Sequence, residues 1–268
     1  MKKKLNRLKL IATVVPLFLI SHHLFASETD DRIESSAKQS YVFKTFLKGD
    51  DINIQSRDGV VTLTGTVAEE SNRSMVGETV ANLPGVKSMN NKLIITDEGP
   101  AVYTDQWLIA KVKLTLLLHR NVNATATKVA AKNGTVTLRG EAISTAQKDL
   151  TTEYVKDVEG VTTVNNKMTI LTAAIKPDEK TMGKTTDAMN EPIDDASVTA
   201  LVKTTLLYHR STSALALKTT VKTKEGVVTL SGKAKSGAEK DLATKIVSDV
   251  HGVKSVNNEM TIKGTKAN

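Results

Sequence analysis

The chain has 268 residues, with 37 lysines and arginines against 29 aspartates and glutamates, no cysteine and one tryptophan. This length is enough for two or three ordinary domains, and an apolar content of 40% excludes wholesale disorder. The lack of cysteine excludes a disulfide scaffold, thiolate zinc sites, iron–sulfur clusters and a cysteine nucleophile, so packed cores must supply the stability.

The first 26 residues have the pattern of a signal peptide. Basic residues crowd positions 1–9, and an unbroken run of apolar or small residues follows at 10–20. This run is too short to span a hydrocarbon core of about 30 Å as a permanent anchor. We therefore expect export with cleavage after Ala26, the alternative being an uncleaved N-terminal tether. Cleavage lowers the formal charge from +8 to +3, which argues against nucleic acid as a partner.

The rest of the chain repeats one unit three times. A block that reads Arg-Asp-Gly-Val-Val-Thr-Leu-Thr-Gly at 57–65 recurs in similar form at 132–140 and 224–232. Twenty residues after the last glycine of each block, a second block begins with Gly-Val and ends with Asn-Asn. Because two blocks keep the same spacing in three copies, we infer three copies of one structural unit.

Each unit opens with a predicted helix. In the first copy Ile33, Ala37 and Tyr41 recur every four residues after Asp30, which is suited to a position near the helix N-cap. The same spacing marks the core of this helix in the other two copies, at Leu108, Val112 and Leu116, and at Val198, Val202 and Leu206.

A hairpin, a second helix and a last strand follow. Asp58-Gly59 predicts a type I′ turn, because both central residues of that turn need positive φ. Gly65 sits where a strand bends or lets another backbone approach, and Gly85 is predicted as the C′ residue of the second helix. Asn91 lies within the last strand or turns at a bulge. Because every copy has this asparagine, we favour a bond to the backbone over ligand binding.

The order α-β-β-α-β predicts an α+β fold of three tandem two-layer modules, each a three-stranded sheet covered on one face by two helices. We expect module one at 27–98, module two at 104–171 and module three at 194–264. A short linker at 99–103 and a flexible linker at 172–193 join them, and 265–268 form a tail.

The Asp-Gly-Val-Val-Thr-Leu-x-Gly block and the Gly-Val-x-x-Val-x-Asn block resemble the BON domain. The resemblance covers essentially the whole chain after the signal peptide. It implies a periplasmic envelope protein without enzymatic activity, which associates with phospholipid surfaces and is linked to osmotic stress and envelope integrity.

Few residues suggest chemistry. The chain has no metalloprotease, hydrolase, Walker or dinucleotide-binding motif, so we expect no enzyme, no cofactor and no small-molecule substrate. His119 and His209 occupy equivalent positions, and a pair of metal ligands is one interpretation. Lys44 takes this position in module one and keeps the charge but not the ligand. We therefore expect no metal and favour a cation at the C-terminus of the first helix.

The first helix of module two has a second apolar stripe. Trp107, Leu114 and Leu118 lie about 120° around the helix from the core stripe, edged by Lys111 and Lys113. An exposed stripe of this kind suits contact with a membrane interface, and packing against module one is the alternative. We assign lipid or partner binding to Trp107, Lys111, Lys113, Leu114, Leu118, Arg120, Tyr208 and Arg210.

Two functions fit this sequence. The first is reversible binding to anionic phospholipid surfaces. The second is a chaperone-like or protein-interaction role toward other envelope proteins, through the same stripe or an exposed sheet edge. Net charges of −4 on module one, +3 on module two and +5 on module three with its tail place a lipid contact on modules two and three. They also allow module one to dock against the other two. The sequence leaves the oligomeric state open.

Overall fold

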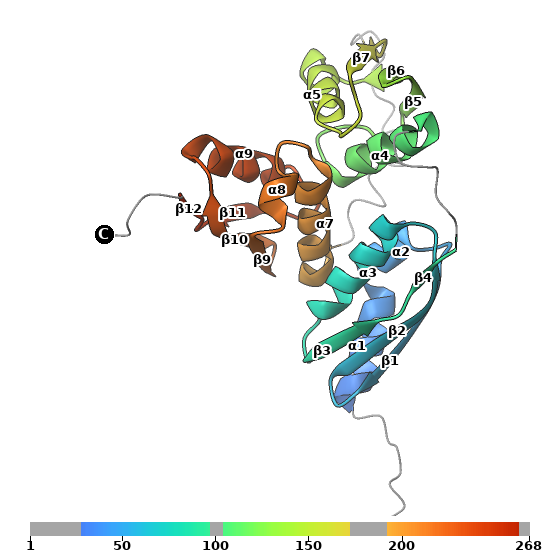
Figure 1. Cartoon of the computed structure of the whole chain (residues 1–268), viewed down its shortest axis with the longest axis vertical. Coiled ribbons are helices and arrows are strands. Elements are labelled where there is room, and N and C mark those ends of the chain that lie inside the picture. The colour runs from blue at the N-terminus through green and yellow to red at the C-terminus, as the bar shows by residue number, and fades with distance from the viewer. Residues whose placement is uncertain (1–27, 97–103, 172–191, 263–268) are drawn as a thin grey trace, which may run out of the picture.

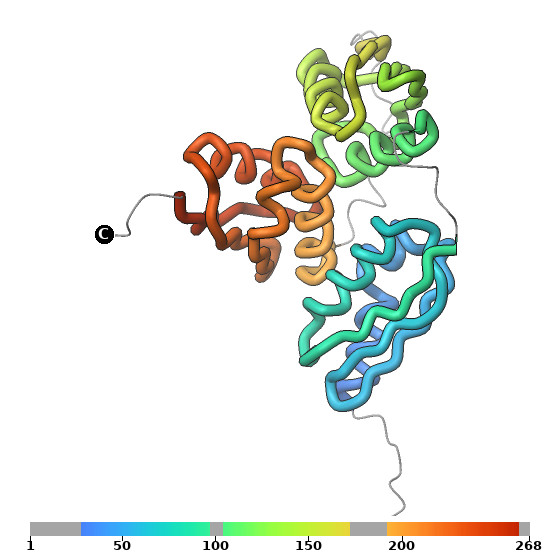
Figure 2. Tube along the Cα trace, in the orientation of Figure 1, coloured from blue at the N-terminus to red at the C-terminus, as the bar shows by residue number. Residues whose placement is uncertain are grey.

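The computed structural model describes residues 28–96, 104–171 and 192–262 (Figure 1). The predicted signal peptide at 1–26, the linker at 99–103, nearly all of the linker at 172–193 and the tail lie outside the described residues. Each of the three described segments folds as one α+β module, as predicted. Figure 2 follows the chain through the three modules from the blue N-terminal one to the red C-terminal one.

The three modules contain the same elements with small differences. Module one has α1 (Glu28–Gln39), α2 (Tyr41–Phe46), β1 (Asp51–Arg57), β2 (Val60–Val67), α3 (Glu70–Ala81), β3 (Ser88–Asn91) and β4 (Ile94–Ile95). Module two has α4 (Asp105–Leu118), β5 (Thr127–Lys132), β6 (Thr135–Ala142), α5 (Thr145–Lys156), β7 (Thr163–Asn166) and β8 (Thr169–Ile170). Module three has α7 (Asp195–Tyr208), α8 (Ser213–Ala216), β9 (Thr219–Lys224), β10 (Val227–Ala234), α9 (Gly237–Ser248), β11 (Ser255–Asn258) and β12 (Thr261–Ile262).

The sheet of each module is mixed, with the second strand in the middle. In module one β2 pairs antiparallel with β1 and parallel with β3 and β4. Val61 and Leu63 are fully buried on the face toward the helices, while Thr62 and Thr64 point outward. Gly65 has φ of 111°, and a Cβ there would lie 2.1 Å from a β1 carbonyl oxygen, which confirms the predicted close approach of another backbone.

An asparagine divides the last strand into two pieces, which is why each sheet has a short fourth strand. The Asn166 side-chain amide donates to the Lys148 carbonyl (2.9 Å), and its Oδ1 accepts from the Met168 N–H (2.9 Å). Asn91 and Asn258 make the same two bonds in modules one and three. The backbone-bonding role is confirmed, and of the two placements the structure has the turn.

The aspartate that opens each unit holds the hairpin turn, and in modules two and three it lies next to the helix N-cap, as predicted. The caps are Thr104 in module two and Asp194 in module three. Asp195 instead accepts hydrogen bonds from the N–H groups of Glu225 (2.7 Å) and Gly226 (2.8 Å). These two residues have φ of 55° and 79°, which confirms the predicted turn geometry. The carboxylate thereby ties the turn to the start of the helix.

The glycines predicted as C′ residues lie farther along the chain than expected. In module two α5 ends at Lys156, Asp157 caps it, and Gly160, with φ of 88°, follows after a further turn. Module three has the same arrangement at 249–252. This extra turn reaches the neighbouring module, as described below.

Two hydrophobic cores result. Module two has its own core, whereas the buried residues of modules one and three form one continuous cluster. The helices α3 and α7 lie side by side where these two modules meet (Figures 1 and 2). The predicted first-helix core is buried in modules two and three. In module one Ile33 and Ala37 are buried on α1, but Tyr41 is half-buried and begins α2, so the single helix predicted there is two helices.

Replacing Asn166 with alanine tests the strand-dividing turn. The variant leaves the Met168 N–H without its partner and removes one of the donors to the Lys148 carbonyl, so we expect a loss of about 1–3 kcal/mol in unfolding free energy. Denaturant unfolding followed by circular dichroism measures it. The control is Asn165→Ala, an exposed position on the same strand, for which we expect a change within about 0.5 kcal/mol. Equal losses in the two variants would contradict this role for the side chain.

Candidate functional site

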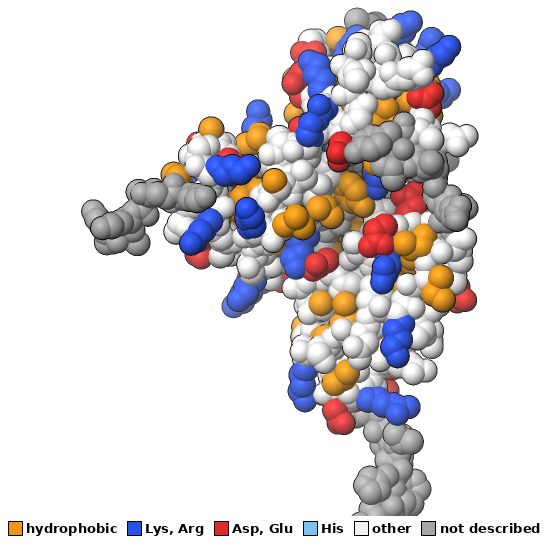
Figure 3. Space-filling view, in the orientation of Figure 1, with side chains coloured by type: hydrophobic (Ala, Val, Ile, Leu, Met, Phe, Trp, Pro, Cys, Tyr) orange, Lys and Arg blue, Asp and Glu red, His pale blue; other side chains and the backbone are white. Residues whose placement is uncertain are grey.

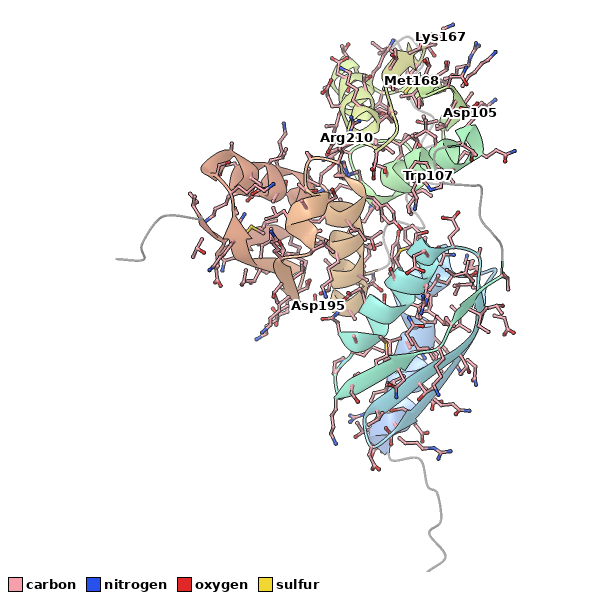
Figure 4. The ribbon with its side chains drawn as sticks, viewed as in Figure 1. Asp105, Trp107, Lys167, Met168, Asp195 and Arg210 are labelled. Atoms are coloured by element: carbon pink, nitrogen blue, oxygen red, sulfur yellow. The ribbon has the colours of Figure 1, made fainter. Side chains whose placement is uncertain are left out.

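The predicted site residues lie where the three modules meet. Figure 4 places Trp107 on the side of module two that faces module one, and Arg210 between modules two and three. On the face shown in Figure 3, apolar side chains gather near this meeting region. We therefore describe the contacts between modules before the surfaces they leave open.

Module one docks on the first helix of module three. The N–H of Tyr41 donates to Oδ2 of Asp194 (2.9 Å), and the N–H of Val42 donates to Oγ of Ser197 (3.1 Å). An ion pair joins Lys203 on α7 to the α3 glutamate Glu78. Side chains at the start of α7 thus accept hydrogen bonds from the backbone N–H groups at the start of α2.

The apolar stripe of α4 is mostly covered, so of the two alternatives, an exposed stripe or a packed one, the structure has the packed one for Leu114 and Leu118. Leu118 is 1% exposed and belongs to the core shared by modules one and three, and Leu114 is half-buried against the same cluster. Trp107 is half-buried against the core of its own module. The reason is that α4 packs against α7, a contact that the sequence of one module does not reveal.

The polar edge of this stripe is also engaged between modules. Nζ of Lys111 lies 3.9 Å from the centroid of the Tyr208 ring and 5.8 Å from that of Trp107. Burial lowers the pKa of Lys111, although the negative charge of Glu69 opposes this shift. Burial raises the pKa of Tyr208 to about 12. Lys113, in contrast, is exposed.

Arg120 and Arg210 join modules two and three by equivalent contacts. The N–H of Arg120 donates to the carbonyl of Asp249 (2.9 Å), and the N–H of Arg210 donates to the carbonyl of Asp157 (2.8 Å). Each guanidinium then bonds carbonyl oxygens in the turn after the partner's second helix. For Arg120 these belong to Ser248 and Val253, and for Arg210 to Lys156, Val158 and Val161.

This junction has an approximate two-fold axis. In each module the residues that follow the first helix contact the end of the second helix of the other module. Matching β-bridges link His119 to Val250 and His209 to Val158. The contact is therefore self-complementary, like the isologous interface of a homodimer. We call it the two-fold junction.

Module one has different residues at the positions that form the two-fold junction. Lys44 and Thr45 replace the histidine and arginine, and Asn82 replaces the aspartate. Lys44 is exposed, and module one contacts module three through α2 and α3 instead. The side chains that make the junction in modules two and three thus change together in the copy that does not use it.

The two histidines meet at the axis of the junction. Nε2 of His119 lies 2.9 Å from Nε2 of His209, and the residues are 0% and 1% exposed. Burial lowers the pKa of His119, which favours its neutral form. Our interpretation of this position as a cation capping the first helix is therefore wrong for His119. No cluster of three or more metal-ligating side chains occurs among the residues described in Figure 1.

Sequence reasoning missed the partners of the histidines. Nδ1 of His209 lies 2.8 Å from Oδ2 of Asp157, and Nδ1 of His119 lies 3.4 Å from Oδ2 of Asp249. Tyr154 stacks on His119, with ring centroids 3.7 Å apart, and donates its hydroxyl to Asp249. Comparing the copies could have found the aspartates, because Asp157 and Asp249 occur with histidine and Asn82 occurs with lysine.

The outer face of the sheet in module three is a second feature that sequence reasoning missed. Val221, Val228 and Leu230 point inward and are buried, so the alternate positions of β9 and β10 face outward. These outward positions are Thr220, Lys222, Lys224, Val227, Thr229, Ser231 and Lys233. They include three exposed lysines and no acidic residue. We call this surface the lysine face.

The corresponding surfaces of the other modules are less basic. In module two the outward positions hold Lys128, Lys132 and Arg139 but also Glu141. In module one they hold Asp51 and Arg57, which balance. Within the described segments no helix has the length and hydropathy needed to cross a bilayer.

The repeated turns and the αββαβ order define a tandem-module protein, and the chain belongs to the BON domain family. The family model matches residues 29–97, 104–172 and 194–264. Osmotically-inducible protein Y of Escherichia coli (strain K12) is 33% identical over 159 residues, which are 59% of this chain and 73% of that protein. These matches confirm the resemblance to the BON domain that the two repeated blocks predict.

Two further proteins resemble parts of the chain. The 21 kDa hemolysin of Actinobacillus pleuropneumoniae is 34% identical over 116 residues, which are 42% of this chain and 59% of that protein. A solved structure of CdsD, a structural protein of the type III secretion system of Chlamydia trachomatis, covers 87% of this chain and 90% of its own. Its TM-score of 0.23 and identity of 15% carry no argument about fold or role.

Replacing Arg210 with alanine tests the two-fold junction. It removes the hydrogen bonds from a charged guanidinium to three carbonyls of module two. A hydrogen bond that involves a charged group typically contributes about 1.5–3 kcal/mol. We expect faster hydrogen exchange at 157–161 and a larger radius of gyration in solution scattering. The control is Arg139→Ala, an exposed arginine on the sheet of module two. If both variants match the unmodified protein, the arginine does not hold the modules together.

Proposed function

We propose that the protein is a non-enzymatic periplasmic protein that binds anionic phospholipid surfaces reversibly, in a role linked to osmotic or envelope stress. The observation that carries the proposal is the lysine face of module three. Lys222, Lys224 and Lys233 are exposed there, on adjacent strands, without an acidic neighbour among the outward positions of β9 and β10. The exported location rests on the predicted signal peptide at 1–26.

The chemistry of the lysine face suits phosphate headgroups. Each lysine near an anionic surface contributes about 1 kcal/mol, and the attraction decays within a Debye length of about 8 Å at physiological salt. Thr229 and Ser231 lie between the lysine positions and offer hydroxyl groups that can donate to phosphate oxygens. Three lysines give weak binding, so release by salt is expected.

This proposal moves the lipid contact away from the first helices. Leu114, Leu118 and Tyr208 pack between modules, and Arg120 and Arg210 bond the backbone of a neighbour. Of the residues predicted to bind lipid, Lys113 is exposed and Trp107 is partly so. The main proposed contact is therefore the lysine face of module three and no longer the apolar stripe of α4. Trp107 lies on module two and is not part of the lysine face.

A second candidate is the chaperone-like role toward other envelope proteins. The observation in its favour is a set of large apolar side chains exposed on all three modules. Leu217 is 82% exposed, Ile94 66% and Ile143 64%. Unfolded polypeptides offer apolar segments that such side chains can contact. These residues lie outside the lysine face, so the two functions respond to different substitutions.

Vesicle co-sedimentation tests the lipid proposal. The purified protein is mixed with phosphatidylcholine vesicles that contain increasing fractions of phosphatidylglycerol, at low and high salt. We expect the bound fraction to rise with phosphatidylglycerol and to fall with salt. The variant Lys222→Glu, Lys224→Glu, Lys233→Glu should bind about a hundredfold more weakly, since each lysine supplies about 1 kcal/mol.

A charge-matched variant in module one is the control. Lys38→Glu, Lys48→Glu, Arg57→Glu produces the same change of formal charge at exposed positions, and it should retain most of the binding. Equal weakening in both variants would indicate a net-charge effect and contradict a lysine-face site. Binding that ignores phosphatidylglycerol, together with suppressed aggregation of an unfolded client, would support the second candidate.

A further inference from the structure

When both histidines of the two-fold junction are neutral, each carries one ring N–H. Only one placement of these two hydrogens fits the hydrogen bonds around the pair. Nδ1 of His209 donates to Asp157 at 2.8 Å, so Nε2 of His209 must accept. Nε2 of His119 therefore donates to it across 2.9 Å. This leaves Nδ1 of His119 unprotonated, and that atom is buried and has no hydrogen-bond partner.

The unpartnered nitrogen is where a first proton binds. Nδ1 of His119 lies 3.4 Å from Oδ2 of Asp249, which already accepts the Tyr154 hydroxyl. A proton on Nδ1 would be shared with that carboxylate and would form an ion pair across the junction. The junction can therefore take up one proton while the modules remain docked.

A second proton has no place in the docked arrangement. It must bind Nε2 of His209, which then carries a hydrogen that points at the N–H of His119. Two donors would face each other at 2.9 Å, on two positive rings that are almost completely buried. Separation of the modules removes both the clash and the burial.

We propose that the two-fold junction is an acid-sensitive latch, in which protonation of both His119 and His209 releases module two from module three and uncovers Leu118. Leu118 is 1% exposed when docked, and its carbonyl accepts the N–H of His251 from module three (3.2 Å). Release breaks this bond and exposes the covered part of the apolar stripe on α4. The latch does not depend on the proposed lipid binding.

The other charged groups around the pair set the direction of the pH effect. Burial lowers the pKa of His119, and the nearby His209 and His251 lower it further, while Asp249 raises it. Burial would raise the pKa of Asp157, but its hydrogen bonds from His209 and Ser211 outweigh this and lower the pKa. Both aspartates bond the latch from the ends of the second helices, and Arg120 and Arg210 flank it.

The sign of the linkage follows from these shifts. A separated module exposes its histidine to water, where the ordinary pKa is about 6.5. Because the docked pKa of His119 is lower, the separated form binds more protons below about pH 6.5, and docking weakens as the pH falls. Asp157 stays charged through this range, since its docked pKa is below the ordinary aspartate value.

Distance measurement in the full chain tests the latch. The chain has no cysteine, so Lys167→Cys in module two and Lys245→Cys in module three, both exposed, can carry two spin labels. At pH 7.5 we expect one narrow distance distribution, and at pH 5 a broad and longer one. Because separation takes up one proton beyond the one that the docked junction can hold, the docking constant falls by up to about tenfold per pH unit. An unchanged distribution at pH 5 overturns the proposal.

Variants identify the groups responsible. His119→Gln with His209→Gln can still form an amide–amide hydrogen bond but cannot titrate, so this pair should stay docked at pH 5. His251→Gln is the matched control, a nearby histidine outside the pair, and it should open like the unmodified protein. Opening of the double-glutamine variant at pH 5 overturns the assignment to these histidines.

A second measurement decides the matter if the double variant is already separated at pH 7.5. The Hε1 resonances of His119 and His209 are followed by NMR in the unmodified chain. The latch requires that both histidines are protonated once the label distance has changed, and that the second of them takes up its proton over the pH range of that change. Protonation of both histidines without opening, or opening without protonation of both, overturns it.

Discussion

The arrangement of modules two and three depends on hydrogen bonds between an arginine of each module and backbone carbonyls of the other. At the end of each second helix the chain makes an extra turn before the glycine, and the carbonyls of that turn receive Arg120 or Arg210 of the other module. These bonds bring His119 to His209 and place α4 against α7. The covered part of the apolar stripe depends on this contact.

Local structure within a module could be predicted from the sequence because the relevant signals are short-range. The Asp-Gly and Asn-Gly turns need positive φ, the four-residue spacing places Leu108 and Val112 inside, and the repeated asparagine pairs with nearby backbone. Short-range signals did not reveal contacts between residues far apart in the chain. Asp195 lies next to the helix N-cap, as predicted, and its carboxylate bonds a hairpin turn about thirty residues away in the chain.

The candidate site was harder to predict, because its environment comes from other modules. Leu118 and Tyr208 have the amphipathic pattern of an exposed stripe, and only the packing of α4 on α7 covers them. His119 follows a helix as a dipole-stabilised cation would, yet burial keeps it neutral. The lysine face was visible as a strand with alternate lysines, but its meaning depends on knowing which side of the sheet the helices cover.

The two-fold character of the junction limits how many modules can join in this way. A self-complementary contact closes as soon as two partners have met, and it cannot propagate along an array as a head-to-tail contact would. An odd repeat must therefore attach by other chemistry, and module one, with Lys44 and Asn82 in place of histidine and aspartate, does so through α7. With three repeats, modules two and three therefore form a closed pair and module one is attached to it. Module one is the copy whose residues differ at the junction positions.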